Sequence, residues 1–393
     1  MLRQISCIEK RFRLWLCYVS KDMPDRAICS DAVSAGFVDG LNAAVNRKAD
    51  MQGCVYPQGK EERKMKSVVP VIFATDDQFA SGCSVAIASM VANCDKARPY
   101  QVYIFYDVLS TDNIKKLSHM GAENVTVEMV KVSQYVDREL LYANQTRTVS
   151  TYFRLFAADI LTQYDRALYL DSDIVVLGDV GELFDMDIGD NLLGGVVIFH
   201  NKPSEIEQQT EYLRETLDLS PEQFFNSGVL SMNLKLFRDE GTKEKCLVFL
   251  REHRQLHWMD QDVLNGVCKG RVCYLPEKWN RSQLYVEDDL AERGAIGDTL
   301  IIHYLTDCKP WLVPFRRSHF YFYQYVILTP YKDELTQRLL ENNAPAKTSR
   351  ERILNRVKNL FFQGNTTPIH LFWYAKCWLW GKIRRFIRKL CRV

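Results

Sequence analysis

The stretch RALYLDSDIVV places two aspartates, Asp171 and Asp173, one residue apart at the end of an apolar run. A carboxylate removed from water is costly unless another group compensates its charge, and two neighbouring carboxylates also repel each other. A hard divalent cation would compensate both, because Mg²⁺ and Mn²⁺ bind carboxylate oxygens. Side chains alternate along an extended segment, so we expect both aspartates on one side and Ser172 on the other. The alternative is that one aspartate caps a turn while the other is solvated.

A third candidate ligand follows a later apolar run. His303 lies in TLIIHYL, and Lys309 comes six residues after it. Imidazole is a suitable third ligand for Mn²⁺, and a nearby lysine would neutralise phosphate oxygens. The alternative is a histidine that only makes structural hydrogen bonds at the end of its strand.

Two other segments carry polar groups among apolar residues. Arg154 lies in TYFRLFAADIL, from which it could reach the aspartate-bearing strand; the alternative is an exposed arginine whose stem lies along apolar surface. Asp260, Gln261 and Asp262 open the helical segment MDQDVLNGV, where the acids could simply complement the helix dipole.

The elements that would position these residues begin at Val68. Apolar runs typical of strands alternate with runs of helical spacing, which predicts βαβ units and a parallel sheet. The strands are expected over 68–75, 101–107, 124–132 and the segment before Asp171, and the helices over 81–94, 110–120 and 151–161. Ligands bind beyond the carboxyl ends of such strands, which is where ATDD (74–77) and DSD both lie.

After residue 190 the sheet is expected to become mixed, and a helix is expected around 204–219. Further strands are predicted at NLLGGVVIF, NSGVLSMNL, RVCYL and TLIIHYL, and residues 330–393 are expected to be helical with polar linkers. The sequence has no G-x-G-x-x-G fingerprint and no Walker loop, so phosphate binding of those two types is not expected.

Six ordered blocks of this chain resemble the bacterial family-eight retaining glycosyltransferases, typified by lipooligosaccharide galactosyltransferases and lipopolysaccharide core glucosyltransferases. The resemblance covers about Val68 to Pro314 and comprises FATDDQFA, TYFRL, ALYLDSDIVV, FNSGVLSMNLKLFR, DQDVLNG and HYLTDCKPW. It implies an α/β fold of the GT-A type, with a mixed, mostly parallel central sheet flanked by helices. The expected domains are an N-terminal extension (1–66), a catalytic domain (67–325) and a helical C-terminal region (326–393).

The resemblance also implies a site for a UDP-sugar donor. Asp171, Asp173 and His303 match the ligands of Mn²⁺ (or Mg²⁺), which holds the diphosphate. Gln261, near the anomeric carbon, and Asp260, beside the donor sugar, are the expected catalytic residues. The residues expected to bind the donor are Ala74, Thr75, Asp76, Phe79, Thr151, Arg154, Asp171, Ser172, Asn226, Ser227, Thr306 and Lys309.

The chain departs from the family pattern at two places. Leu305, Thr306, Asp307 and Cys308 stand where relatives often have small, glycine-type residues before the lysine, and Gln78 stands where many have Asn. Neither departure removes a metal ligand, so activity is still expected.

The implied activity is transfer of a hexose, galactose or glucose, from a UDP-sugar to a glycan or glycolipid acceptor such as the lipopolysaccharide or lipooligosaccharide core. A divalent cation and Lys309 would stabilise the departing diphosphate. Front-face attack is favoured over a covalent intermediate, because the amide of Gln261 is a poor nucleophile. Alternatives are a membrane-associated protein that binds UDP-sugar without transferring it, a self-glycosylating protein, and a haloacid-dehalogenase-type phosphatase. The phosphatase family has Thr two residues after its second Asp, where this chain has Val175.

The charge of the chain is unevenly distributed. The formal net charge is +2, but residues 368–393 contain seven Lys and Arg and no acid, so the remainder is acidic and a nucleic-acid partner is not expected. The same tail contains three of the Trp residues, a composition typical of helices that lie in an anionic membrane surface. We therefore expect a cytoplasmic protein attached peripherally to the inner face of the cytoplasmic membrane. The alternative is a helix packed on the catalytic domain with its basic face solvated.

The cysteines and the N-terminus fit this location. The 12 cysteines include no C-x-x-C pair, which favours reduced thiols in the cytoplasm. The first 22 residues are interrupted by charges too often for a signal peptide, and no run is long enough to span a membrane. Residues 1–66 are expected to be poorly ordered, and one hypothesis is that translation begins at Met65.

Overall fold

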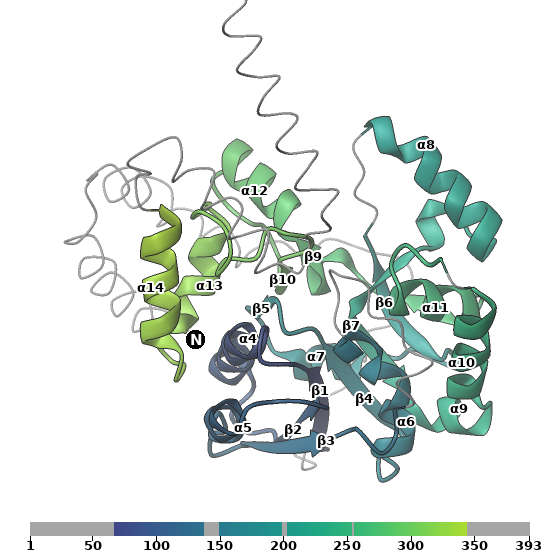
Figure 1. Cartoon of the computed structure of the whole chain (residues 1–393), viewed down its shortest axis with the longest axis horizontal. Coiled ribbons are helices and arrows are strands. Elements are labelled where there is room, and N and C mark those ends of the chain that lie inside the picture. The colour runs from purple at the N-terminus through teal and green to yellow at the C-terminus, as the bar shows by residue number, and fades with distance from the viewer. Residues whose placement is uncertain (1–66, 137–148, 199–202, 254, 344–393) are drawn as a thin grey trace, which may run out of the picture. The chain divides into compact units, whose positions relative to one another are not determined.

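A seven-stranded sheet forms the centre of the protein (Figure 1). The computed structural model describes residues 67–136, 149–198, 203–253 and 255–343. The strands of this sheet, in spatial order, are β3 (Val125–Lys131), β2 (Tyr100–Tyr106), β1 (Val69–Ala74), β4 (Arg166–Leu170), β7 (Phe225–Asn233), β6 (Leu193–Val197) and β8 (Val272–Tyr274).

Six of these strands run in one direction and β7 runs in the other. β1 pairs in parallel with β2 and β4, β2 with β3, and β6 with β8, whereas β7 is antiparallel to both neighbours, β4 and β6. The carboxyl ends of the parallel strands therefore share one edge of the sheet with the amino end of β7. The prediction of a mixed, mostly parallel sheet is confirmed.

A second, three-stranded sheet brings distant segments to the same edge. β10 (Ile301–His303) lies between β5 (Ile174–Val176), to which it is antiparallel, and β9 (Arg281–Ser282), to which it is parallel. In this register His303 faces Ile174, the residue that directly follows Asp173. The short β5–β10 ladder therefore sets His303 beside the paired aspartates.

Helices cover both faces of the large sheet. Within β1, Val71 and Phe73 belong to one hydrophobic core, and Ile72 and Ala74 belong to another on the opposite face, which explains why the whole strand is apolar. Figure 1 shows α4, α5, α13 and α14 to one side of the strands, and α6, α9, α10 and α11 to the other.

The helices begin and end at the following residues. The α-helices are α4 (Ala80–Asn93), α5 (Thr111–Ser118), α6 (Ala157–Ile160), α7 (Val180–Asp185), α8 (Pro203–Tyr212), α9 (Leu234–Asp239), α10 (Thr242–Glu252), α11 (Asp260–Val267), α12 (Gln283–Glu292), α13 (His319–Val326) and α14 (Lys332–Asn343). Segments of other helix types are η1 (Val149–Phe156), η2 (Leu213–Leu217), η3 (Pro221–Gln223) and η4 (Glu277–Trp279).

The helices predicted within the described residues are present, with one difference in type, whereas the helical prediction beyond residue 343 lies outside the described residues. The segment 151–161 is mostly the 3₁₀ helix η1, and only four residues continue as α6. The helix predicted around 204–219 is α8 followed by the short π-helix η2. Ser110 caps α5, since its hydroxyl accepts from the N–H of Asn113.

The expected domain division remains a prediction. Residues 1–66 and 344–393, which include the N-terminal extension and the basic tail, lie outside the described residues. The expected boundary after residue 325 falls within α13, and α13 packs against α4. No helix of the described part of the chain is both long and apolar enough to cross a bilayer.

Candidate functional site

The DSD segment forms a tight turn between β4 and β5. The N–H of Asp171 donates to the carbonyl of Gly228 at 2.8 Å, and the Ser172 hydroxyl donates to the carbonyl of Ala74 at 2.7 Å. The segment is thus a turn and not the extended strand assumed above. Its two aspartates nevertheless converge while Ser172 points toward β1. The alternative of one capping and one solvated aspartate is wrong.

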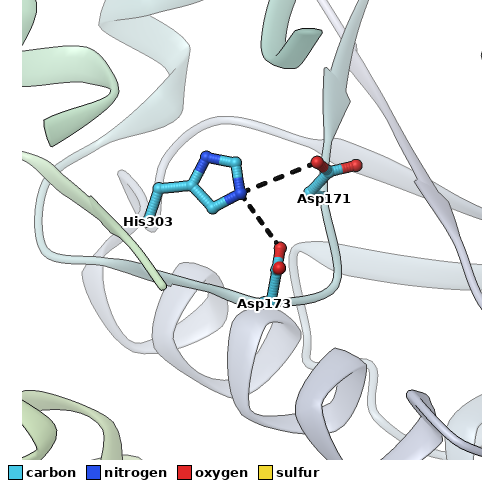
Figure 2. A group of neighbouring side chains, drawn as sticks. All are labelled: Asp171, Asp173 and His303. Carbon is cyan, nitrogen blue, oxygen red and sulfur yellow. Dashed lines mark hydrogen bonds and ion pairs between the residues drawn. The ribbon is translucent and has the colours of Figure 1, made fainter. Parts of the chain in front are cut away.

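Asp171, Asp173 and His303 form a three-residue cluster (Figure 2). One ligand atom from each residue lies within 4.8 Å of the others. The Nε2 atom of His303 is 3.1 Å from Oδ1 of Asp173 and 3.7 Å from Oδ2 of Asp171. His303 and Asp173 are buried, whereas Asp171 is partly exposed.

Asn280 determines which nitrogen of His303 faces the aspartates. Its side-chain NH₂ donates to Oδ1 of Asn226 at 2.9 Å, which leaves its own Oδ1 to accept from Nδ1–H of His303, also at 2.9 Å. In the neutral ring Nε2 then carries a lone pair directed at the two carboxylates. Three electron-pair donors therefore face one point, which is the donor set that Mn²⁺ accepts, and the residues fit the expected cation.

Asn280 was not predicted from the sequence as a site residue. It is fully buried and appears in the sequence only within a potential glycosylation motif, N-R-S. Its sequence shows only a polar residue directly after the apolar Trp279. The structure places it directly before β9, the neighbour of the His303 strand.

Substituting Asn280 by alanine is expected to weaken Mn²⁺ binding by about 10- to 100-fold, the usual effect of losing a group that orients a ligating histidine. Without the amide, the His303 ring can rotate or carry its proton on Nε2. Titration of Mn²⁺ by isothermal calorimetry would measure the change. Asn342→Ala, a substitution at a partly exposed amide on α14, is the control and should leave the affinity unchanged. Equal affinities in the wild type and Asn280→Ala would show that Asn280 does not orient the ligand.

Arg154 is a buried cation behind the cluster. Its Nη2 is 2.8 Å from Oδ1 of Asp171, and its Nε is 3.2 Å from Oδ2 of Asp260. The guanidinium also donates to the carbonyl of Ser227 and lies over the ring of Tyr169, 4.1 Å from its centroid. Burial alone would lower the pKa of Arg154, but the charges of Asp171 and Asp260 outweigh it and raise the pKa above its ordinary value. The alternative of an exposed arginine is wrong.

Asp260 and Gln261 are held against the first residues of β7. The Ser227 hydroxyl donates to Oδ2 of Asp260 at 3.0 Å. Oε1 of Gln261 accepts from the Asn226 amide at 2.9 Å and from the N–H of Ser227 at 3.3 Å. Asp260 thus interacts with specific partners in addition to lying in the first turn of α11. With two donors on its oxygen, Gln261 is also a poorer nucleophile than a free amide.

The turn before these two residues is strained. Met259 has φ +53° and ψ −114°, a conformation that non-glycine residues rarely adopt. Oδ2 of Asp262 stabilises this turn, because it accepts from the N–H of Trp258 at 2.7 Å and from the hydroxyl of Tyr212 at 2.8 Å. Asp262, the second acid of the DQD motif, therefore positions Asp260 and Gln261 from within the fold.

Lys309 reaches the cluster from the segment after β10. Its ammonium donates to the carboxylate of Asp173 and to the carbonyl of Tyr304. Burial alone would raise the pKa of Asp173, but the positive charge of Lys309 and its hydrogen bond to the carboxylate hold that pKa below its ordinary value. Asp173 thus stays ionised, as a metal ligand must.

The ATDD segment ends β1 beside the DSD turn. Thr75 is buried and its N–H donates to the carbonyl of Phe105 at 3.0 Å. Oδ1 of Asp76 accepts from the N–H groups of Gln78 and Phe79, and the ring of Phe79 contacts Trp311 edge to face. The hydrogen bond from Ser172 to Ala74 is the direct link between this segment and the cluster.

The remaining two expected donor residues have backbone roles in the structure. The carbonyl of Thr151 accepts from Nε of Arg154 at 2.9 Å. Thr306 has φ +57°, in the region that favours glycine. The backbone thus retains at Thr306 the conformation suited to the small residues that relatives often have there.

His319 packs behind the His303 segment and is expected to make stability depend on pH. Burial, followed by the charge of Arg316, lowers the pKa of His319 from 6.5 to about 4. The unfolded chain binds a proton at His319 more readily than the folded chain does. The free energy of unfolding therefore decreases as the pH falls from 6.5 toward 4. From pH 7.5 to pH 5, His319 should remove about 2 kcal/mol of the free energy of unfolding.

Urea unfolding of the wild type and His319→Gln at both pH values measures this contribution. The glutamine variant lacks the titration and should lose about 2 kcal/mol less than the wild type on acidification. Equal losses in the two proteins would contradict the prediction.

The comparison with solved structures gives the class of this fold. The chain is similar to the apo structure of the bifunctional glycosyltransferase WbbM, with a TM-score of 0.59, 26% identity, and coverage of 73% of this chain and 53% of that chain. It is also similar to galactosyltransferase LgtC in complex with donor and acceptor sugar analogs, with a TM-score of 0.52, 22% identity, and coverage of 72% and 99%. The fold is that of a GT-A-type glycosyltransferase, as predicted.

The sequence comparisons identify the family. The model of glycosyl transferase family 8 matches residues 70–313, and the chain belongs to this family. It is 28% identical over 252 residues to lipopolysaccharide 1,3-galactosyltransferase of Salmonella typhimurium, and 30% identical over 252 residues to lipopolysaccharide 1,2-glucosyltransferase of Escherichia coli. Each alignment covers 61% of this chain and 72% of the relative. Family membership overturns the alternative of a haloacid-dehalogenase-type phosphatase.

Proposed function

We propose that this protein is a metal-dependent retaining hexosyltransferase that moves galactose or glucose from a UDP-sugar to a lipopolysaccharide or lipooligosaccharide core, or to another cell-surface glycan. The observation that carries the proposal is the cluster of Asp171, Asp173 and His303, in which Asn280 directs the Nε2 lone pair toward both carboxylates. The relatives named for lipopolysaccharide galactosyl and glucosyl transfer support the substrate class.

The residues of the cluster would hold Mn²⁺ or Mg²⁺, which acts as a Lewis acid on the diphosphate. Lys309, already paired with Asp173, lies where it can exchange that carboxylate for a diphosphate oxygen. The loss of UDP breaks the bond between the anomeric carbon and a phosphate oxygen. The acceptor hydroxyl forms the new bond, and its proton passes to the departing phosphate, so no separate protein base is needed.

Gln261 and Asp260 would act on the sugar and not as covalent nucleophiles. The oxygen of Gln261 is engaged by Asn226 and Ser227, and Asp260 is engaged by Arg154 and Ser227. These contacts fix both side chains beside the amino end of β7. A fixed carbonyl dipole and a fixed carboxylate stabilise positive charge on a sugar ring without forming a bond to it. Front-face attack therefore remains the favoured mechanism.

Hydrolysis of UDP-galactose and UDP-glucose, measured with Mn²⁺, with Mg²⁺ and with EDTA, tests the proposal. We expect cation-dependent release of UDP that Asp173→Ala abolishes. Asp333→Ala, at an almost fully exposed carboxylate, is the control and should retain the wild-type rate. Binding of UDP and Mn²⁺ without release of sugar from either donor would instead support the non-catalytic alternative. A gain in mass of the protein on incubation with donor alone would indicate self-glycosylation.

We also propose that residues 368–393 bind the anionic inner face of the cytoplasmic membrane. The support is compositional, namely seven basic residues with Trp and no acid, in a segment outside the described residues. Deletion of residues 368–393 should reduce binding to vesicles that contain phosphatidylglycerol by at least tenfold while leaving UDP release unchanged. Unchanged sedimentation with these vesicles would refute the proposal.

A further inference from the structure

A cavity opens at the carboxyl edge of the large sheet, beyond β6 and β8. It has a volume of about 580 Å³, and its walls include Val197, Tyr274, Glu277, Arg281 and Tyr285. β6 and β8 run parallel to each other, and both run antiparallel to β7, whose first residues contact Asp260 and Gln261. The cavity and the proposed donor site therefore lie along the same edge.

Strand pairing and one pair of adjacent residues join this cavity to the donor site. Val196 pairs with Asn226, and Val197 with Phe225, across a bulge in the β6–β7 ladder. Arg281 directly follows Asn280, which contacts both Asn226 and His303. A molecule in the cavity thus lies beside the strand residues that contact Gln261, the residue expected near the anomeric carbon of the donor.

The cavity presents exposed tyrosine rings. Tyr274 is 45% exposed and Tyr285 is 37% exposed, and both are among the few large hydrophobic side chains exposed in the described part of the chain. The Tyr274 hydroxyl donates to the carbonyl of Gln223 at 3.1 Å, and the Arg281 guanidinium lies 5.6 Å from the centroid of the Tyr285 ring. Rings held in place lose little conformational entropy when a ligand packs on them, and their apolar faces suit the C–H face of a sugar.

The charge of the cavity favours an uncharged ligand. Arg281 lies 2.7 Å from Oε1 of Glu277 and 2.6 Å from Oδ2 of Asp289, so two carboxylates offset its single positive charge. A phosphate or carboxylate group would meet these acids, whereas sugar hydroxyls can donate to them. The combination of aromatic faces and paired polar groups is typical of sites for small polar ligands.

We infer that this cavity binds an uncharged hexose ring of the acceptor, with Tyr274 and Tyr285 packing on it and Glu277 accepting from its hydroxyls. The inference rests on the proposed function, because a hexosyltransferase needs an acceptor sugar at the anomeric end of its donor. Tyr274 and Tyr285 thereby contribute to the choice of acceptor and leave the donor and its cation untouched.

Saturation-transfer-difference NMR with lactose, methyl β-glucoside and glucose 6-phosphate tests this inference in the presence of UDP and Mn²⁺. Lactose or methyl β-glucoside should bind the wild type, and their dissociation constants should rise at least fivefold in Tyr285→Ala and Tyr274→Ala. Tyr285→Phe keeps the ring and should bind as the wild type does. Tyr135→Ala, at a tyrosine of equal exposure just after the strand at the opposite end of the sheet, should also bind normally.

The outcomes separate this inference from the proposed function. Release of UDP without acceptor should remain within twofold of wild type in both tyrosine variants. If the wild type releases no UDP from any donor, the proposed function fails, whereas saccharide binding still decides the inference. The inference is overturned if neither neutral saccharide binds, if both alanine variants bind them as the wild type does, or if glucose 6-phosphate binds more tightly than the neutral sugars.

Discussion

Replacing Gly228 by alanine is expected to abolish Mn²⁺ binding and to lower sugar transfer at least 100-fold. A Cβ atom at this position would lie 2.2 Å from Cε1 of His303 and 2.6 Å from Oδ2 of Asp171. Neither neighbour can yield easily, because His303 is held by Asn280 and the Asp171 carboxylate is held by Arg154. Overpacking of this kind costs about 1–3 kcal/mol of stability and moves the ligands apart. Mn²⁺ titration and a UDP-release assay would measure both effects.

Gly178→Ala is the matched control, at a buried glycine between β5 and α7. Its Cβ atom would meet only the side chain of Leu300, with a closest approach of 2.7 Å, and a leucine end can shift. We expect Gly178→Ala to lose some stability and to retain Mn²⁺ affinity. If Gly228→Ala binds Mn²⁺ as tightly as Gly178→Ala does, His303 and Asp171 are not the cation ligands.

Replacing Arg154 by methionine is expected to lower the free energy of unfolding by about 3–5 kcal/mol, which is the usual cost of leaving buried carboxylates without their cation. Arg154 pairs with Asp260, whose side chain is only 5% exposed, and with the partly exposed Asp171. Methionine restores the apolar volume and supplies no charge. Urea unfolding at pH 7.5 gives the free energy, and UDP release by any folded variant should fall at least 100-fold.

Arg98→Met is the control for the loss of a buried arginine. It distinguishes that loss from the effect of leaving buried carboxylates without their cation. Arg98 is as deeply buried as Arg154, but its partner Asp185 is 54% exposed and can be solvated once the arginine is gone. We expect the Arg98 variant to lose less stability than Arg154→Met and to keep its UDP-release activity. Equal losses of stability would mean that the carboxylates near Arg154 are adequately solvated without it.

Periodicity predicted most of the fold because the central elements are long. The runs that became β1, β2, β3 and α4 each extend over six or more residues, enough to show whether their apolar side chains repeat with strand or helix spacing. The apolar run TLIIHYL predicted β10, but β5 and β9 contain only three and two residues, so no period identifies them and the second sheet could not be predicted. The type of η1 was likewise undetermined, since 3₁₀ and α-helices have similar apolar patterns over two turns.

The candidate site could be predicted where neighbouring carboxylates need one cation to compensate their charges. The spacing of Asp171 and Asp173 pointed to a cation, and His303 followed as a third ligand. The sequence left two environments open for Arg154, and only its burial between Asp171 and Asp260 decided between them. Asn280 could not be predicted, because its role depends on the pairing of two very short strands.

The site also has a consequence for how the chain becomes able to bind its cation. Gly228, on the reversed strand β7, fixes the Asp171 backbone, and His303 and Asp173 are 130 residues apart in sequence. Contacts between such distant residues form late, because the entropy of closing the intervening chain must be overcome first. Partly folded chains therefore lack the complete ligand set. Mn²⁺ should slow unfolding much more than it accelerates refolding, so that the bound cation makes the protein kinetically persistent.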